Sequence, residues 1–185
     1  MSYEFEDGYK IRDQGALHFM TFQVVDWIDI FSRKTYRDIV LNNIEYCRQN
    51  KNLLHGAYVI MSNHIHVIWR SKSEKMSDLL RDFKSFTSKQ IVQAVQNEPE
   101  SRREWLLHMF RFYANRTNQN KEFKVWTSNN HPEEIYTEKF LLTKLNYVHE
   151  NPERAGLVEL PEHYIYSSAS NYKTGKGISI VDLLI

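Results

Sequence analysis

The sequence predicts an α+β fold in which helices pack on an antiparallel sheet. Three observations carry this prediction. Short segments rich in β-branched and aromatic residues alternate with longer segments whose apolar residues recur at helical spacing. The expected order is strand, helix, strand, strand, helix, followed by a helix, a short strand and a last helix. The 185 residues are 42% hydrophobic and 25% charged, a composition that suits one folded domain with a buried core.

The first half of the chain supplies most of the predicted sheet. The segment 16–25 (ALHFMTFQVV) is expected to form a strand, and the spacing of apolar residues predicts a helix over 36–49. The segments 53–61 and 64–69 are predicted to be the two strands of a hairpin, because the dipeptide SN between them is a turn signal.

The second half of the chain is mainly helical. An apolar face predicts a helix over 76–96 with Ser77 as its N-cap, and an amphipathic helix is expected over 103–114. The segment 123–128 is expected to be a short strand. With its helices on one face of the antiparallel sheet, this order gives a ferredoxin-like layout.

The chain ends with a helix and an extension. Thr137 is expected to cap a last helix over 138–151, which Pro152 stops. The predicted domain covers 1–152. Residues 153–185 are expected to form a C-terminal extension that is either part of the same domain or loosely packed on it.

Charge and cysteine content exclude some classes of protein. The net charge of +1 neither favours nor excludes a nucleic-acid partner. The segment from Arg70 to Lys89 holds six bases and three acids, and the segment from Arg102 to Trp126 holds six bases and two acids. Such segments form either a patch that faces phosphates or solvated helix faces. Cys47 is the only cysteine, which excludes an intramolecular disulfide and a cysteine-based zinc site.

Cellular location can be anticipated from what the sequence lacks. No apolar run approaches the roughly 18 residues of a membrane span. Residues 1–7 lack the basic and apolar regions of a signal peptide. We therefore expect a cytoplasmic, nucleoid-associated protein without a membrane partner.

A histidine pair is the first candidate functional feature. His64 and His66 lie in the string MSNHIHVIWR, two residues apart. In a strand this spacing puts both side chains on the same face, about 7 Å apart at their Cα atoms. Two imidazoles on one face can share a divalent metal ion, whereas Ile65 and Val67 would point into the core. An isolated pair of this kind is usually incidental, so the pair needs partners.

The last helix offers those partners. Phe140, Leu141, Leu145 and Val148 form an apolar stripe that should dock on the sheet. Tyr147 and Asn151 are four residues apart and share a helix face. A tyrosine hydroxyl close to a metal ion can act as a nucleophile, and Asn151 offers a neutral oxygen ligand. The alternative for Tyr147 is an amphipathic residue at a helix–sheet edge.

Several strings resemble one known family. AYVIMSNHIHVIW resembles the histidine-pair (HUH) segment of single-tyrosine transposases, with FMTFQVVDW before it and LLRDFKSFTSKQI after it. YVHENPERAGLV and PEHYIYSSASNY look like the C-terminal signature of the REP-associated tyrosine transposases. The resemblance runs from about Tyr9 to Tyr172, nearly the whole chain.

The resemblance implies a ferredoxin-like domain that binds single-stranded or hairpin DNA. It implies a metal-dependent endonuclease and strand transferase whose tyrosine attacks a phosphodiester and leaves a 5′-phosphotyrosine and a free 3′-hydroxyl. His64 and His66 match the family's metal-binding histidines. Tyr147 and Asn151 match the tyrosine and third metal ligand of the insertion-sequence relatives. Mg²⁺ or Mn²⁺ is the expected metal, and a monomer is favoured over a dimer.

One stretch departs from the family pattern. Many REP-associated members carry a tyrosine shortly after a tryptophan, in a segment like WQxxY. Here the stretch from Trp126 to His131 (WTSNNH) has no tyrosine. Tyr147 is therefore the predicted nucleophile and Tyr136 the reserve. The alternative is a domesticated, non-catalytic binder of structured DNA or RNA on the same fold.

Basic and aromatic residues are expected to contact the DNA. The predicted phosphate contacts come from six basic side chains: Arg70, Lys84, Lys89, Arg111, Arg116 and Lys124. Four aromatic residues can stack on unpaired bases or pack in the core: Trp69, Phe112, Tyr113 and Trp126.

Overall fold

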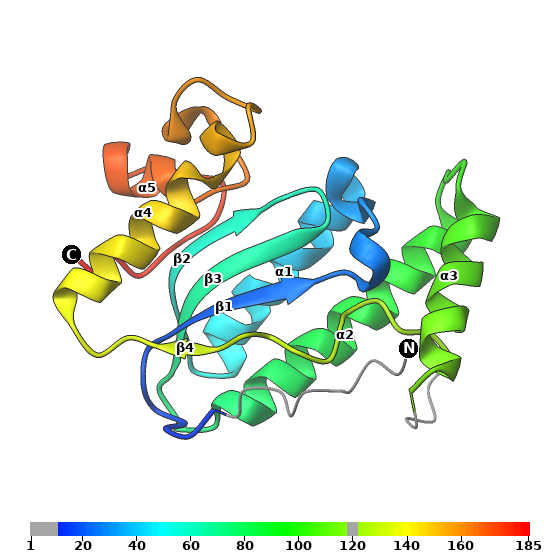
Figure 1. Ribbon diagram of the computed structural model, residues 1–185, viewed down its shortest axis with the longest axis horizontal. Helices are drawn as coiled ribbons and strands as arrows, with labels where there is room; N and C mark the ends of the chain where they lie inside the picture. Colours follow the sequence, from blue (N-terminus) through cyan, green and yellow to red (C-terminus); the bar gives the residue numbers. More distant parts are fainter. Residues whose placement is uncertain (1–10, 118–121) are drawn as a thin grey trace, which may run out of the picture.

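A computed structural model describes residues 11–117 and 122–185 (Figure 1). The strands are β1 (His18–Gln23), β2 (Leu53–Ile60), β3 (His64–Ser71) and β4 (Glu133–Glu134). The α-helices are α1 (Lys34–Asn50), α2 (Met76–Asn97), α3 (Arg103–Asn115), α4 (Glu138–Arg154) and α5 (Ala169–Thr174). Three short 3₁₀ turns are η1 (Val25–Trp27), η2 (Ile30–Ser32) and η3 (Pro161–His163). Among the described residues, no helix is long and apolar enough to cross a membrane.

The sheet confirms the predicted α+β, ferredoxin-like fold. Its strand order is β2-β3-β1-β4, and every pairing is antiparallel. The β2–β3 hairpin turns at 61–63 as predicted, with Met61 N donating to His64 O at 2.9 Å. Along β1 and β3, Thr21 lies opposite His66. This register brings side chains of the two central strands together on one face.

Both faces of the sheet are covered, so the prediction of helices on one face is wrong for α4. Figure 1 shows α1 and α2 on one side of the sheet and α4 and α5 on the other. The face toward α1 and α2 carries the larger core, which includes Phe22, Val67 and Trp69. The opposite face packs Ile68 against Leu145 of α4. Periodicity shows that a helix has an apolar stripe but not which face of the sheet the stripe meets.

Some helix ends differ from their predictions. Lys75, not Ser77, precedes the first turn of α2, and Ser77 N donates to Gln14 Oε1 at 2.8 Å. The backbone N–H group of Ser77 at this helix end thus bonds to a side chain more than 60 positions away in the sequence. Thr137 caps α4 as predicted, accepting from Phe140 N at 3.2 Å. Pro152 does not stop α4, which runs on to Arg154. A proline removes only its own N–H bond to the preceding turn, and the residues after it can still donate, as Ala155 N does to Asn151 O at 3.0 Å.

The segment 123–128 forms only one isolated bridge, between Val24 and Trp126. It is extended beside the end of β1, with Thr127 N donating to Gln23 O at 2.9 Å. The short strand β4 lies further along, at Glu133–Glu134. The short strand therefore forms later in the sequence than predicted, just before α4.

The chain after α4 returns to the outer edge of β2. Ile60 N donates to Tyr166 O, and Ser168 N donates to Tyr58 O, each at 2.9 Å. Further along, Asp182 N donates to His55 O at 2.8 Å. These backbone bonds satisfy an edge strand that would otherwise be exposed. They tie the segment beyond 152 to the sheet, and the predicted boundary at 152 falls inside α4.

Candidate metal and nucleophile site

The start of β3 presents two histidines on the face covered by α4. The ring centroids of His64 and His66 are 4.7 Å apart, with the ring planes at 70°. Ile65 and Val67, which alternate with them, are completely buried in the core on the other face. His66 is 5% exposed and His64 is partly buried. The geometry therefore gathers two imidazoles at one point, as the strand spacing predicted.

One nitrogen of each ring is held by a neighbouring side chain. Thr21 Oγ1 lies 2.8 Å from His66 Nδ1, and Asn63 Oδ1 lies 2.7 Å from His64 Nδ1. An amide oxygen can only accept, so His64 Nδ1 donates and the neutral ring keeps a lone pair on Nε2. Protein ligands of metal ions commonly have their second ring nitrogen held in this way. The two contacts orient both rings.

The surroundings favour the neutral form of both histidines. Burial lowers the pKa of His66 to about 3, and the charges of His64, Arg154 and Lys144 add to this effect. Burial also lowers the pKa of His64 below its ordinary value. Removing an imidazolium from water is costly, which is why burial favours the neutral ring. A neutral imidazole is the form that binds a metal ion.

Helix α4 brings Tyr147 to the histidines. Leu145 and Val148, at 3% and 0% exposure, anchor the helix on the sheet. Tyr147 lies between them in sequence and is 40% exposed. Its ring meets the His66 ring edge to face, with centroids 5.1 Å apart. The predicted nucleophile is therefore in contact with the histidine pair and open to solvent on one side.

Two cations flank Tyr147, and the sequence analysis did not find them. The Arg154 guanidinium carbon lies 4.7 Å from the centre of the Tyr147 ring, and its Nη2 donates to Tyr147 O at 2.8 Å. Lys144 Nζ lies 4.5 Å from the Phe19 ring centre and 6.0 Å from that of Tyr147. Their spacing from Tyr147, three residues before and seven after, is a helix-face signal that was available in the sequence.

The residues present fit a metal ion only with a neutral third donor. The described residues contain no group of three or more His, Cys, Asp or Glu side chains placed to hold an ion. His64 and His66 supply two imidazoles, and Asn151 lies one helical turn after Tyr147 on α4. Asn151 is partly buried, and its side chain forms no hydrogen bond with the described residues. The two imidazoles favour Mn²⁺ over Mg²⁺, whereas an amide oxygen, water and phosphate oxygens suit either ion.

The reserve nucleophile, Tyr136, is placed differently. It is 78% exposed in the connection between β4 and α4. A hydrogen bond with Glu134 raises the pKa of Tyr136 and disfavours its phenolate. Within the described residues it makes no ring contact with His64 or His66.

Three of the six predicted DNA-binding residues share one groove. Lys84, Lys89 and Lys124 line a groove of about 900 Å³ between α2 and the segment 122–132. Lys84 donates to Thr127 O at 2.8 Å and also contacts Asn130 Oδ1. These three lysines form one basic groove at the sheet edge.

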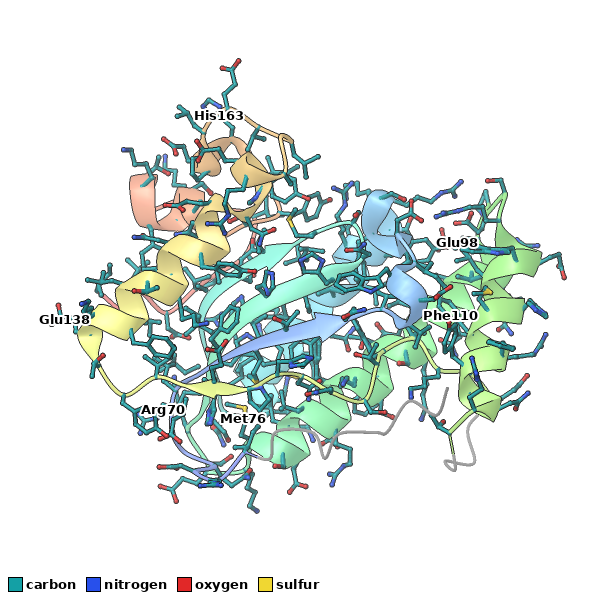
Figure 2. All side chains as sticks on the ribbon, viewed as in Figure 1. Arg70, Met76, Glu98, Phe110, Glu138 and His163 are labelled. Carbon is teal, nitrogen blue, oxygen red and sulfur yellow. The ribbon has the colours of Figure 1, made fainter. Side chains whose placement is uncertain are left out.

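The three arginines do not line this groove, but Arg111 contacts two residues that do, Glu122 and Phe123. Arg111 stacks on Phe123, with 4.7 Å between guanidinium carbon and ring centre, and pairs with Glu122 at 3.4 Å. Arg116 lies over the Phe112 ring at 5.1 Å. Arg70 donates to Gly15 O at 2.7 Å. Arg70, labelled in Figure 2, lies near the end of β3, the strand that His64 begins.

Two of the four predicted stacking residues are in the core. Trp69 is 0% exposed and Trp126 is 3% exposed, so neither reaches a base. Both share the core with Phe22, and their indole N–H groups bond to His55 Nδ1 and Thr87 Oγ1. Of the two roles that the sequence left open for them, both therefore take the one of packing in the core, which the large apolar area of tryptophan favours. Phe112 is exposed, and the partly buried Tyr113 donates to Asp26.

Fold and site together define a class of protein: a ferredoxin-like α+β domain whose sheet presents a histidine pair to a tyrosine on an added helix. No known family's sequence profile matches the chain. No curated protein matches it in sequence.

Among solved structures, the chain is similar to a REP-associated tyrosine transposase bound to a REP hairpin. The TM-score is 0.65 at 16% sequence identity, and the match covers 97% of this chain and 94% of that one. At this identity the likeness establishes the shared fold. It extends over nearly the whole chain.

Proposed function

We propose that this protein is a transposase-like DNA endonuclease and strand transferase that uses a tyrosine nucleophile assisted by a divalent metal ion. The observation that carries the proposal is the contact between Tyr147 and His66, with His64 beside them. One solved structure with the same fold is a REP-associated tyrosine transposase bound to a REP hairpin. Hairpin-bearing single-stranded DNA is the substrate class this likeness suggests.

The side chains at the site suit attack on a phosphodiester. His64 and His66 would hold the metal ion through their free ring nitrogens, with Asn151 as a third donor. When bound, Mg²⁺ or Mn²⁺ would neutralise charge on the scissile phosphate and polarise its oxygens. Arg154 and Lys144 lie beside Tyr147, where they pair with Glu150 and Glu133. By exchanging these carboxylates for the DNA phosphate, they would offset the repulsion between a phenolate and an anionic phosphate.

The proposed step balances without an external energy source. Tyr147 Oη forms a bond to phosphorus, and the bond from phosphorus to the 3′ oxygen breaks. The phenolic proton passes to solvent, and the departing 3′ oxygen takes a proton from solvent. The phosphotyrosine conserves the bond energy, so the 3′-hydroxyl of another strand can reverse the step and rejoin DNA.

We further propose that a monomer suffices for this chemistry. Leu145 and Val148 pack α4 on its own sheet, so Tyr147 and the histidine pair come from the same chain. An exchanged helix from a second copy is not needed to complete the site. The proposed location is the bacterial cytoplasm, with the nucleoid as partner.

A denaturing gel for a covalent protein–DNA adduct tests the proposal. A labelled hairpin oligonucleotide pool with randomised single-stranded flanks is incubated with Mn²⁺ or Mg²⁺. We expect the full-length protein to form an adduct that is lost in Tyr147→Phe, in His64→Ala and with EDTA. Tyr136→Phe is the matched control, because it removes one exposed hydroxyl away from the histidines, and it should form adduct like wild type.

A second function is favoured by the segment 126–131, which lacks the tyrosine that many REP-associated transposases carry there. A domesticated binder of structured DNA or RNA would bind the hairpin pool but form neither product nor adduct. The same gel identifies this result. Cleavage without an adduct would instead indicate attack by water, and adduct formation by Tyr147→Phe would exclude this residue as the nucleophile.

A further inference from the structure

A strained turn lies at the rim of the histidine pair. Asp26 and Trp27 have φ angles of 55° and 54°, in the left-handed region. This region is uncommon for residues other than glycine, and for a bulky residue such as tryptophan it is a genuine outlier. Two such residues in succession persist only when the surrounding structure imposes the conformation, and strain of this kind clusters at functional sites.

The turn is fixed by contacts on both sides. Val24 N donates to Asn63 O at 3.0 Å, which ties the turn to the residue before His64. Val25 N donates to Val125 O at 2.8 Å, and Val25 and Ile28 are buried at 2% and 4% exposure. These anchors leave the two residues between them little choice of backbone path.

The result of this strain is an exposed indole beside His64. Trp27 is 60% exposed, and its ring centroid lies 6.0 Å from that of His64, with the planes at 81°. An edge-to-face contact uses one ring edge and does not cover both π faces of an indole. The turn thus holds an aromatic surface at a fixed place next to the proposed phosphate position.

We infer that Trp27 is a stacking platform for the unpaired nucleobase next to the phosphate bound at His64 and His66. The inference rests on the proposed function, because it needs a nucleic-acid substrate at that pair. Stacking on an aromatic ring is the common way in which proteins hold unpaired bases, and it tolerates any sequence. A paired base is already stacked in its helix, so the platform selects single-stranded flanks or loops.

The neighbouring charges favour a base over a phosphate at this position. Asp26 precedes Trp27 and accepts a hydrogen bond from Tyr113 Oη at 2.8 Å. Asp29 lies just beyond and pairs with Arg102 at 2.6 Å. Arg102 offsets the charge of Asp29, whereas the Asp26 carboxylate beside the uncharged indole repels a phosphate oxygen and leaves the π face available. We therefore expect Trp27 to distinguish DNA with bases from DNA without them.

Binding measurements on three variants test the platform. All are made in a Tyr147→Phe background so that cleavage does not consume the probe. The probe is the hairpin pool with randomised flanks, compared with the same hairpin carrying abasic flanks. Trp27→Asn removes the ring while suiting the left-handed backbone, Trp27→Phe keeps a ring, and Trp105→Ala removes another exposed tryptophan, on α3.

Trp27→Asn should bind the base-bearing pool about 5- to 150-fold more weakly than its background, the range for loss of one stacked base. Its affinity for the abasic pool should be unchanged. Trp27→Phe should recover most of the loss, and Trp105→Ala should bind like the background. Equal affinity of Trp27→Asn and the background for the base-bearing pool would overturn the platform while leaving the proposed function intact. Failure of wild type to bind either pool would overturn both.

Discussion

Two buried histidines lie on neighbouring strands, one on each face of the sheet. Burial lowers the pKa of both His55 and His66 to about 3. His55 lies on the core face, where Trp69 Nε1 donates to its Nδ1 at 2.7 Å. His66 lies on the α4 face, where Thr21 holds its Nδ1 and Tyr147 meets its ring.

The two histidines differ in the surroundings of Nε2, the ring nitrogen that Trp69 and Thr21 do not hold. Because His55 accepts at Nδ1, its neutral ring carries the proton on Nε2, and this buried atom has no hydrogen-bond partner among the described residues. The neighbour of His66 is another imidazole with a lone pair on Nε2, and the site opens to solvent beside Tyr147. A depressed pKa therefore reports burial on both faces, and only the tautomers and neighbours identify a site.

The largest expected effect is a difference in stability between a substitution on the core face and a substitution on the α4 face. Phe22→Ala should lower the free energy of unfolding by about 3–5 kcal/mol, the usual cost of deleting a buried aromatic ring. Phe22 is fully buried, with ring contacts to Trp69, Phe83 and Trp126. Tyr147→Ala should cost about 1 kcal/mol or less, because this ring is 40% exposed. Denaturant unfolding of both variants measures the contrast, and equal losses would contradict it.

The next effect is a difference in metal binding between the histidines on the two faces of the sheet. If His64 and His66 bind Mn²⁺, ion at 100 times its Kd should stabilise wild type by about 2.7 kcal/mol. For a chain of this size that corresponds to a rise in Tm of roughly 5–10 °C. His64→Ala should abolish the rise, whereas His55→Gln should retain it, because the core histidine offers no free lone pair.

Thermal unfolding with and without Mn²⁺ checks this prediction independently of any DNA, and EDTA should reverse the shift. Circular dichroism first establishes that both variants are folded. A rise in Tm that survives in His64→Ala would place the bound ion elsewhere. If His55→Gln also lost the rise in Tm, the histidines on the two faces would not differ in metal binding.

The elements with strong local periodicity could be predicted from the sequence. The β2–β3 hairpin, α1 and α2 follow from spacing within each segment, and the alternation of His64 to Val67 assigned each side chain to the correct face. The Thr137 cap was also predictable, because its bond reaches only three residues ahead. In each case the deciding contacts are close in sequence.

Contacts between distant segments could not be predicted in this way. The end of α2 is satisfied by Gln14, and the edge of β2 is paired by backbone groups near Tyr166 and Ser168. Backbone hydrogen bonds carry no side-chain pattern, so the segment beyond 152 gave no strand signal. The left-handed backbone at Trp27 arises from anchors in other segments, and nothing in its own residue types indicates it.

The smallest expected effect is the pH dependence that His55 adds to stability. The unfolded chain protonates this histidine near its ordinary pKa of about 6.5, whereas the folded chain resists protonation down to about 3. The folded state therefore loses no stability through His55 above pH 6.5 and loses it progressively as pH falls toward 3.

The matched variant is His55→Gln, whose amide oxygen can still accept from Trp69 and which cannot titrate. Between pH 7.5 and pH 5, wild type should lose about 2 kcal/mol more of its free energy of unfolding than the variant. Carboxylates that titrate in this range affect both proteins alike and cancel in the comparison. Denaturant unfolding across the pH series gives the two curves. If the two curves run parallel, the folded chain protonates His55 as readily as the unfolded chain does. The core face would then hold a buried positive charge, which burial and the nearby charge of Arg48 disfavour.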